Sequence, residues 1–286
     1  MSAPAVRSFF HEGTATWTHV AYDPGAKRAA IVDPVLDYNP VNGAWSTKSA
    51  DALLAFLREE GLTLDYLLET HIHADHLSAA PYLKDEAGGV IGIGAGVASV
   101  QETWNKRFNL AGVSAATPAH FDRQFTDNEP LPLGGIEGRV LSTPGHTAND
   151  VTYVFGDAAF VGDTFFNADY GVARTDFPGG DAPTLYRSLQ KIMALPANTH
   201  LFLCHDYLAG DRKERVAVTS LTDQRANVMF GGLGEAAFVE MRRARDKELT
   251  PPVLLFPSVQ VNIRAGELPP AEDNGAAFLK IPLRKA

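Results

Sequence analysis

Three histidines and one aspartate occur within six residues, directly after an apolar segment. The cluster comprises His71, His73, Asp75 and His76, and the apolar run at residues 66–68 is typical of a buried strand. Imidazole and carboxylate groups are ligands for zinc, iron, manganese or nickel. The chain must therefore fold so that a strand ends where several metal-binding side chains converge.

Three further candidate ligands also follow apolar runs. They are His146, which Gly145 precedes, Asp163, which follows Gly162, and His205, which follows Cys204. With the first four residues they make seven nitrogen or oxygen donors. A structural zinc site normally has four ligands, which are often cysteines. The set instead predicts a catalytic centre, with either two metals that share a carboxylate or one metal surrounded by spare ligands.

Composition excludes several other classes of function. The 286 residues are 45% hydrophobic, enough for one large domain or two modest ones. The net charge is −9 and the basic residues are scattered, so we expect no nucleic-acid partner. No stretch approaches the roughly 18 apolar residues of a membrane span, so we expect no membrane partner. The single cysteine and the absence of an apolar leader favour a cytoplasmic protein.

Predicted strands and helices alternate along the chain, without repeats or a low-complexity linker. Apolar runs predict the strands, and apolar residues at helical spacing predict the helices. The predicted strands span residues 9–10, 14–22, 27–32, 64–68, 90–93, 137–141, 151–155, 158–161, 201–203 and 258–263. The predicted helices span 49–60, 77–86, 97–108 and 182–193, and the charged region 211–246 is also predicted to be helical.

Strands precede helices in each half of this pattern. This order is typical of an α/β sandwich, in which two sheets pack together and helices cover their outer faces. We expect a single domain over residues 1–286, with residues 231–286 as a C-terminal extension packed on it. From Pro251 onward the chain is predicted to be extended.

The ligand pattern resembles that of the metallo-β-lactamase superfamily. The matching motifs are His71-x-His73-x-Asp75-His76, Gly145-His146, Gly162-Asp163 and His205. The resemblance implies an αββα sandwich with the metal in a cleft at one edge of the sheets. The superfamily includes hydrolases, oxidoreductases and nucleases, so the fold alone does not determine the reaction.

Finer motifs resemble persulfide dioxygenases, and in particular a bacterial branch related to β-lactamase-like hydrolase proteins. Such a protein would oxidise glutathione persulfide with O2 to sulfite and glutathione. The similar segments are Ala173-Arg174-Thr175-Asp176-Phe177, Cys204-His205-Asp206-Tyr207, Asn262-x-Arg264-x-Gly266 and residues 176–181.

The resemblance also implies a cofactor and its ligands. One Fe(II) per subunit would be held by His71, His146 and Asp163, a two-histidine, one-carboxylate face that leaves positions open for O2 and a substrate sulfur. A homodimer is expected from the family. The remaining candidates, which would orient those ligands or hold a second metal, are His73, Asp75, His76 and His205.

Three residues outside the ligand set are candidates for contact with the substrate. Arg174 would either bind a substrate carboxylate or pair with Asp176. Tyr207 would hydrogen-bond the substrate or pack, and we favour the first. Arg225 is a candidate for a glutathione carboxylate, although a solvated helix face explains it better. Tyr207 and Arg174 are therefore the predicted catalytic residues.

Two other functions compete with the dioxygenase. The first is a thioester hydrolase of the glyoxalase II type, in which water activated by two zinc ions attacks the thioester. One zinc would bind His71, His73 and His146, the other Asp75, His76 and His205, with Asp163 between them. The second is a sensor or scaffold without turnover, which the intact ligand set disfavours. The segment 173–177 and the pattern at residues 262–264 favour the dioxygenase over the hydrolase.

Overall fold

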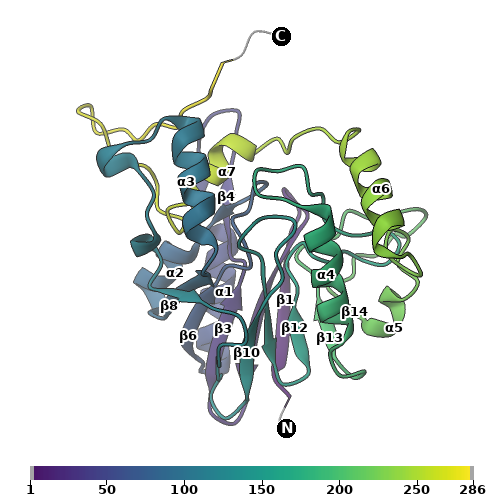
Figure 1. The fold of residues 1–286 in the computed structure, drawn as a ribbon. Coiled ribbons are helices and arrows are strands. Elements are labelled where there is room, and N and C mark those ends of the chain that lie inside the picture. The colour runs from purple at the N-terminus through teal and green to yellow at the C-terminus, as the bar shows by residue number, and fades with distance from the viewer. Residues whose placement is uncertain (1–2, 284–286) are drawn as a thin grey trace.

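Two β-sheets face each other, and helices cover the outer face of each (Figure 1). This computed structural model describes residues 3–283. The prediction of an αββα sandwich is confirmed. That residues 231–286 form a C-terminal extension of a single domain stays a prediction.

The first sheet has six strands, in the order β1-β2-β3-β6-β8-β9. The first three are antiparallel neighbours, whereas β3, β6, β8 and β9 run parallel to one another. The carboxyl ends of β3, β6 and β8 therefore lie at one edge. The strands are β1 (Ala5–His11), β2 (Thr16–Asp23), β3 (Arg28–Val32), β6 (Thr63–Leu68), β8 (Val90–Gly94) and β9 (Arg123–Phe125).

The second sheet has five strands, in the order β10-β11-β12-β13-β14. Because β11 is antiparallel to both β10 and β12, and β13 is parallel to β12, the strands β10, β12 and β13 end at the same edge. The strands are β10 (Gly138–Ser142), β11 (Val151–Phe155), β12 (Ala158–Phe160), β13 (His200–Phe202) and β14 (Val218–Ser220). A small third sheet joins β4 (Val35–Tyr38), β5 (Trp45–Ser46) and β7 (Leu77–Ser78).

Alternation along the strands builds three layers of apolar packing. In β3, Val32 points into the space between the sheets, whereas Ile31 points outward. In β12, Phe160 lies between the sheets and Ala159 packs outward. Period-two alternation of buried residues on both faces is expected where helices cover both sides of a sandwich.

Each of the two large sheets is covered by its own set of helices (Figure 1). The first sheet packs against α1 (Lys48–Glu60), α2 (Ala80–Ala87) and α3 (Val97–Phe108), and the second against α4 (Ala182–Met193) and α6 (Glu235–Asp246). Three shorter helices are η1 (Gly112–Ser114), η2 (Pro118–His120) and α5 (Leu221–Gln224). Within residues 3–283, no helix has both the length and the apolar character needed to cross a membrane.

The strand predicted at residues 258–263 is wrong. This segment belongs to the helix α7 (Leu255–Asn262). Apolar and polar residues alternate there as in a strand, but both sets are buried. Val259 and Val261 enter the core of the first sheet, and Gln260 and Asn262 are satisfied by hydrogen bonds. Tertiary packing therefore overrides the local pattern.

The predicted helix over residues 211–246 is also wrong for much of its length. It resolves into loop, β14, α5, a glycine-containing connection and α6. Gly232 adopts a φ of 73°, in the left-handed region that interrupts a right-handed helix. The predicted helix 77–86 likewise begins late, because residues 77 and 78 form β7 and Pro81 lies in the first turn of α2.

Removing the side chain of Leu189 tests the packing of α4 on the second sheet. Leu189 is fully buried, so Leu189→Ala should lower the free energy of unfolding by about 2–5 kcal/mol. Urea unfolding of the metal-free protein measures this change. Val41 is 92% exposed, and Val41→Ala should change stability by less than about 0.5 kcal/mol. Equal shifts for the two variants would contradict the packing described.

Candidate metal centre

The seven candidate ligands lie on loops that follow strands ending at one edge of the sandwich. The loops follow β6, β10, β12 and β13. Backbone hydrogen bonds join the two sheets at this edge: Trp17 N donates to Cys204 O at 2.7 Å, and Val151 N donates to Thr70 O at 3.0 Å. The sandwich thereby brings together residues that are up to 134 positions apart in sequence, from 71 to 205.

One group of ligand atoms comes from His71, His146 and Asp163. Asp163 Oδ2 lies 3.9 Å from His71 Nε2 and 3.6 Å from His146 Nε2. One atom from each of the three residues lies within 4.8 Å of the others. The two histidines are buried and the carboxylate is nearly so.

Hydrogen bonds fix the ring orientation of both histidines. Thr70 Oγ1 donates to Asp33 Oδ2 at 2.9 Å, so it accepts from His71 Nδ1 at 3.0 Å. His146 Nδ1 donates to the carbonyl oxygen of Arg174 at 2.8 Å. In each ring the Nε2 lone pair is left to face Asp163, which is the tautomer a metal ligand needs. Burial lowers the pKa of His71 well below its ordinary value.

The loop that carries His146 is held at two points. Gly145 has a φ of 144°, and a Cβ atom there would lie 2.4 Å from the backbone of Leu185 in α4. Asp150 accepts hydrogen bonds from the backbone N–H of His146 at 2.9 Å and of Thr147 at 2.7 Å. Burial raises the pKa of Asp150 to about 6.

A second group surrounds His205. His205 Nε2 lies 3.2 Å from Asp75 Oδ2 and 3.3 Å from Asp163 Oδ1. The two oxygens of Asp163 therefore face different histidines. His205 also converges within 4.8 Å with His73, His76 and Cys204. Burial raises the pKa of the Cys204 thiol well above its ordinary value.

His73 is paired with two carboxylates that the sequence analysis did not select. Its Nε2 lies 2.9 Å from Asp33 Oδ1 and 3.4 Å from Glu69 Oε2. Burial lowers the pKa of an imidazole, but the Asp33 and Glu69 carboxylates together outweigh burial and hold the pKa of His73 well above its ordinary value. Burial raises the pKa of Glu69. The three groups form a buried ionic cluster behind the candidate ligands.

Several buried nitrogen and oxygen atoms of the candidate ligands lack a hydrogen-bond partner among the described residues. Leaving such atoms unsatisfied in a protein interior costs free energy, and coordination to metal would satisfy nitrogen and oxygen atoms of this kind. This arrangement of nitrogen and oxygen atoms therefore fits a metal. The atoms are His71 Nε2, His73 Nδ1, His76 Nε2, His205 Nε2 and Asp163 Oδ1.

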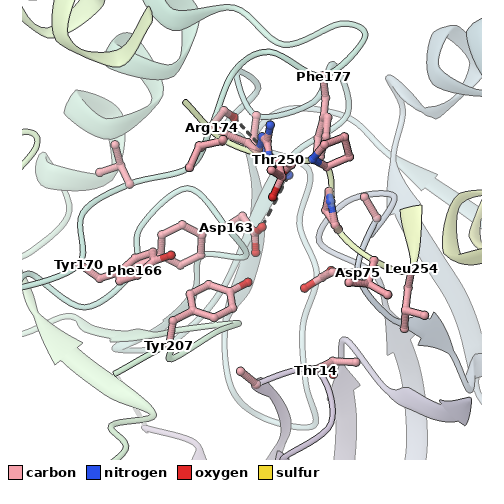
Figure 2. A pocket seen from close by; sticks show the side chains of 18 of the residues that line it. Thr14, Asp75, Asp163, Phe166, Tyr170, Arg174, Phe177, Tyr207, Thr250 and Leu254 are labelled. Atoms are coloured by element: carbon pink, nitrogen blue, oxygen red, sulfur yellow. Dashed lines mark hydrogen bonds and ion pairs between the residues drawn. The ribbon is translucent and has the colours of Figure 1, made fainter. Parts of the chain in front are cut away.

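The centre opens into a cavity of about 700 Å³, whose lining includes Asp75, His146 and Asp163. The aromatic side chains of Phe166, Tyr170 and Tyr207 form one wall (Figure 2). The loop 11–15 and the segment 249–254 form other parts of the lining. A substrate in this cavity would have its reacting end at the metal ligands.

Tyr207 and Arg174 both line the cavity, in different ways. The ring of Tyr207 stacks on His205, with centroids 5.3 Å apart. Burial and the nearby carboxylates of Asp75 and Asp163 raise the pKa of Tyr207 well above its ordinary value, so its hydroxyl stays a donor. Arg174 pairs with Asp176 through Nε at 2.6 Å and Nη2 at 2.7 Å, and its Nη1 donates to Thr250 O at 2.8 Å (Figure 2).

Arg225 lies elsewhere. It follows α5 directly, its side chain is exposed, and it is not among the residues that line the cavity. The structure therefore does not bring Arg225 together with the other candidate residues.

Asn262 in α7 supports the histidine loop from behind. Its Nδ2 donates to the carbonyl oxygens of His73 at 2.9 Å and His76 at 2.7 Å. Its Oδ1 accepts from Ser78 N at 2.9 Å. Gly266, with a φ of 92°, leaves no room for a Cβ beside Pro81. The Asn262-x-Arg264-x-Gly266 pattern thus belongs to the scaffold of the centre.

Sequence reasoning missed residues whose role depends on tertiary neighbours. Asp33 directly follows the predicted strand at residues 27–32, and a polar residue at the end of that strand was a usable signal. Glu69 and Thr70 directly precede the first histidine, and their position after the strand at residues 64–68 was a similar signal. Nothing in the local pattern pointed to Arg242 or to the segment 249–254, which enter the cavity lining from the C-terminal region.

Similar proteins carry both hydrolase and dioxygenase names. A probable metallo-hydrolase of Burkholderia pseudomallei is 48% identical over 97% of this chain and 98% of its own. Glyoxylase B2 of Dictyostelium discoideum is 44% identical over 94% of each chain. The mitochondrial persulfide dioxygenase ETHE1 of Bos taurus is 30% identical over 71% of this chain and 68% of its own.

Solved structures and a family model agree on the fold. The crystal structure of ETHE1 from Myxococcus xanthus matches with a TM-score of 0.73 and 26% identity, over 92% of this chain and 100% of that chain. The model of the metallo-beta-lactamase superfamily matches residues 15–205, a span that includes all seven candidate ligands. This chain therefore belongs to the metallo-beta-lactamase superfamily.

Proposed function

We propose that the protein is a glutathione-dependent persulfide dioxygenase, which uses one Fe(II) and O2 to convert glutathione persulfide to sulfite and glutathione. The ligands would be His71, His146 and Asp163. Similarity to persulfide dioxygenase ETHE1 of Bos taurus and to the ETHE1 structure from Myxococcus xanthus supports this assignment. The share of the chain covered by that structure, 92%, means that the likeness is not confined to the ligand motifs.

The main support for the proposal is which candidate ligands have their ligand atoms close together. Among residues 3–283, three sets have one ligand atom from each residue within 4.8 Å of the others, and His71, His146 and Asp163 form one of them. Neither ligand triad of the hydrolase, His71–His73–His146 or Asp75–His76–His205, is among the three sets. A two-histidine, one-carboxylate face is the arrangement used by non-haem iron oxygenases.

Bound Fe(II) would supply open positions for a sulfur ligand and O2. The residues of this chain would position and shield the reactants. Thr70 and the Arg174 carbonyl hold the two histidine rings, and the Tyr207 hydroxyl is available to donate a hydrogen bond to a substrate atom. Phe166, together with Tyr170, limits access of water from one side of the cavity.

Metal content should separate the one-metal arrangement from the two-metal one. Anaerobic protein loaded with Fe(II) and passed through a desalting column should retain about one iron per chain. Asp163→Ala should lose it, and Asp75→Asn should keep it, because Asp75 faces His205 rather than His71. Elemental analysis measures both. The control is His200→Ala, which alters an exposed histidine outside the centre.

Two metals per chain in the wild type, reduced to one by Asp75→Asn, would contradict a mononuclear centre. Loss of iron from His200→Ala to the same extent as from Asp163→Ala would show that the assay does not report on this site.

The hydroxyl of Thr70 gives a test of ligand orientation. Thr70→Val keeps the shape of the side chain but removes the acceptor of His71 Nδ1. Loss of such a supporting hydrogen bond typically weakens metal binding by about 10–100-fold. Competition with a chelator measures the affinity for Fe(II). Thr103→Val, a half-buried threonine on α3 outside the centre, should leave it unchanged. Unchanged affinity in Thr70→Val would mean that Thr70 does not orient His71.

A dinuclear thioester hydrolase is the second candidate, and one observation favours it. Asp163 Oδ2 faces His71 and His146 while Oδ1 faces His205, as a carboxylate shared by two metals would. The names of two relatives that span nearly the whole chain, a probable metallo-hydrolase and glyoxylase B2, agree with hydrolysis.

Oxygen consumption distinguishes the two reactions. Fe(II)-loaded protein given glutathione persulfide should consume O2 and release sulfite in matching amounts, and Asp163→Ala should abolish both. Zinc-loaded protein should show neither. Cleavage of lactoylglutathione by the zinc-loaded form, with no oxygen consumption by the iron-loaded form, would replace the dioxygenase by the hydrolase.

A further inference from the structure

Three arginines line the cavity that contains the candidate metal ligands. Arg174 precedes α4, and Arg242 and Arg245 lie on α6, three residues apart and therefore on one face of the helix. The family model ends at residue 205, so α6 lies outside the part of the chain that it matches.

Arg174 is fully engaged. It forms a two-point ion pair with Asp176, donates to Thr250 O, and lies over the ring of Phe177 at 4.7 Å (Figure 2). Of the two roles predicted for Arg174, the structure shows the pair with Asp176. Through Thr250, Arg174 also holds the segment 249–254 against the cavity.

Arg242 is almost completely buried, at 1% exposure, yet incompletely satisfied. Its Nη1 donates to Val172 O at 3.1 Å, and its Nη2 lies 2.7 Å from Asp246 Oδ1. Its Nε has no hydrogen-bond partner among the described residues. A buried guanidinium with an unused donor, in a side chain that lines a cavity, is suited to an anionic ligand.

Arg245 is the third arginine. Its side chain is exposed and lines the same cavity, and within residues 3–283 it forms no ion pair or side-chain hydrogen bond. The carboxylates beside the other two arginines are already used: Asp176 pairs with Arg174, and Asp246 pairs with Arg242 and accepts from Thr175. Of the three guanidinium groups, that of Arg245 is therefore the one without a carboxylate partner among residues 3–283.

We propose that Arg245, supported by Arg242, binds a carboxylate on the non-reacting arm of a thiol-derived substrate. This inference rests on the proposed function, because it concerns the same cavity, but it applies equally to a persulfide and to a thioester of one thiol. A single unmatched charge fits one carboxylate rather than a dianionic phosphate. The carboxylates of glutathione lie on its glutamyl and glycyl residues, away from the cysteinyl sulfur. We therefore take glutathione as the ligand of this subsite.

Binding of glutathione without turnover tests the subsite. Glutathione is titrated calorimetrically into Fe(II)-loaded protein under nitrogen, with the wild type, Arg245→Gln and Arg243→Gln. Arg243 is an exposed arginine on the same helix that lines a separate groove, so it controls for a general effect of charge. Arg245→Gln should raise the Kd about tenfold, the effect of losing one charged hydrogen bond. Arg243→Gln should change it by less than twofold.

A ligand without free carboxylates completes the test. Glutathione diethyl ester should bind the wild type about tenfold more weakly than glutathione, and Arg245→Gln should not weaken it further. The proposal is overturned if the wild type does not bind glutathione, if Arg243→Gln weakens binding as much as Arg245→Gln, or if Arg245→Gln weakens the ester equally.

The outcome is separable from that of the proposed function. If Arg245→Gln weakens glutathione binding but the wild type consumes no O2 with the persulfide, the subsite stands and the dioxygenase does not. If the wild type consumes O2 and releases sulfite while Arg245→Gln binds glutathione normally, the dioxygenase stands and the subsite does not.

Discussion

The carboxylate of Asp33 determines the geometry of the candidate metal centre. It accepts hydrogen bonds from the backbone and the hydroxyl of Thr70, and it lies against His73. A buried carboxylate is costly unless its lone pairs are used, and here protein groups use them. Because Thr70 in turn fixes the ring of His71, the orientation of a candidate ligand depends on a residue of the neighbouring strand. Asp33 adopts a φ of 52°, which is uncommon outside glycine and places its side chain inside the sandwich edge.

The carboxylate of Asp163 lies between the two groups of candidate ligands. One oxygen faces His71 and His146, and the other faces His205, so a single side chain contacts both groups of potential ligands. With this geometry, Asp163 could serve a metal held by either group of residues. A change in which group retains a metal would alter the chemistry without altering the sandwich.

Much of the fold and of the ligand positions could be predicted because both follow from local patterns. Apolar strands that end in histidine or aspartate locate the centre, and helices such as α3 and α4 show clear apolar spacing. α7 could not be predicted, since its residues alternate like a strand while the core encloses them on all sides. The partner of Arg174 remained open from sequence because a guanidinium suits a ligand and a neighbouring carboxylate equally well. Arg242 and Arg245 were missed because only the folded chain brings α6 to the cavity.

The hydrogen bonds of Asn262 join the histidine loop to a helix far along the chain. The residues they connect are separated by 189 and 186 positions. During synthesis, the histidines leave the ribosome long before Asn262 does, so the loop lacks this support while translation continues. Assembly of the centre therefore belongs to a late stage of folding, after α7 has packed.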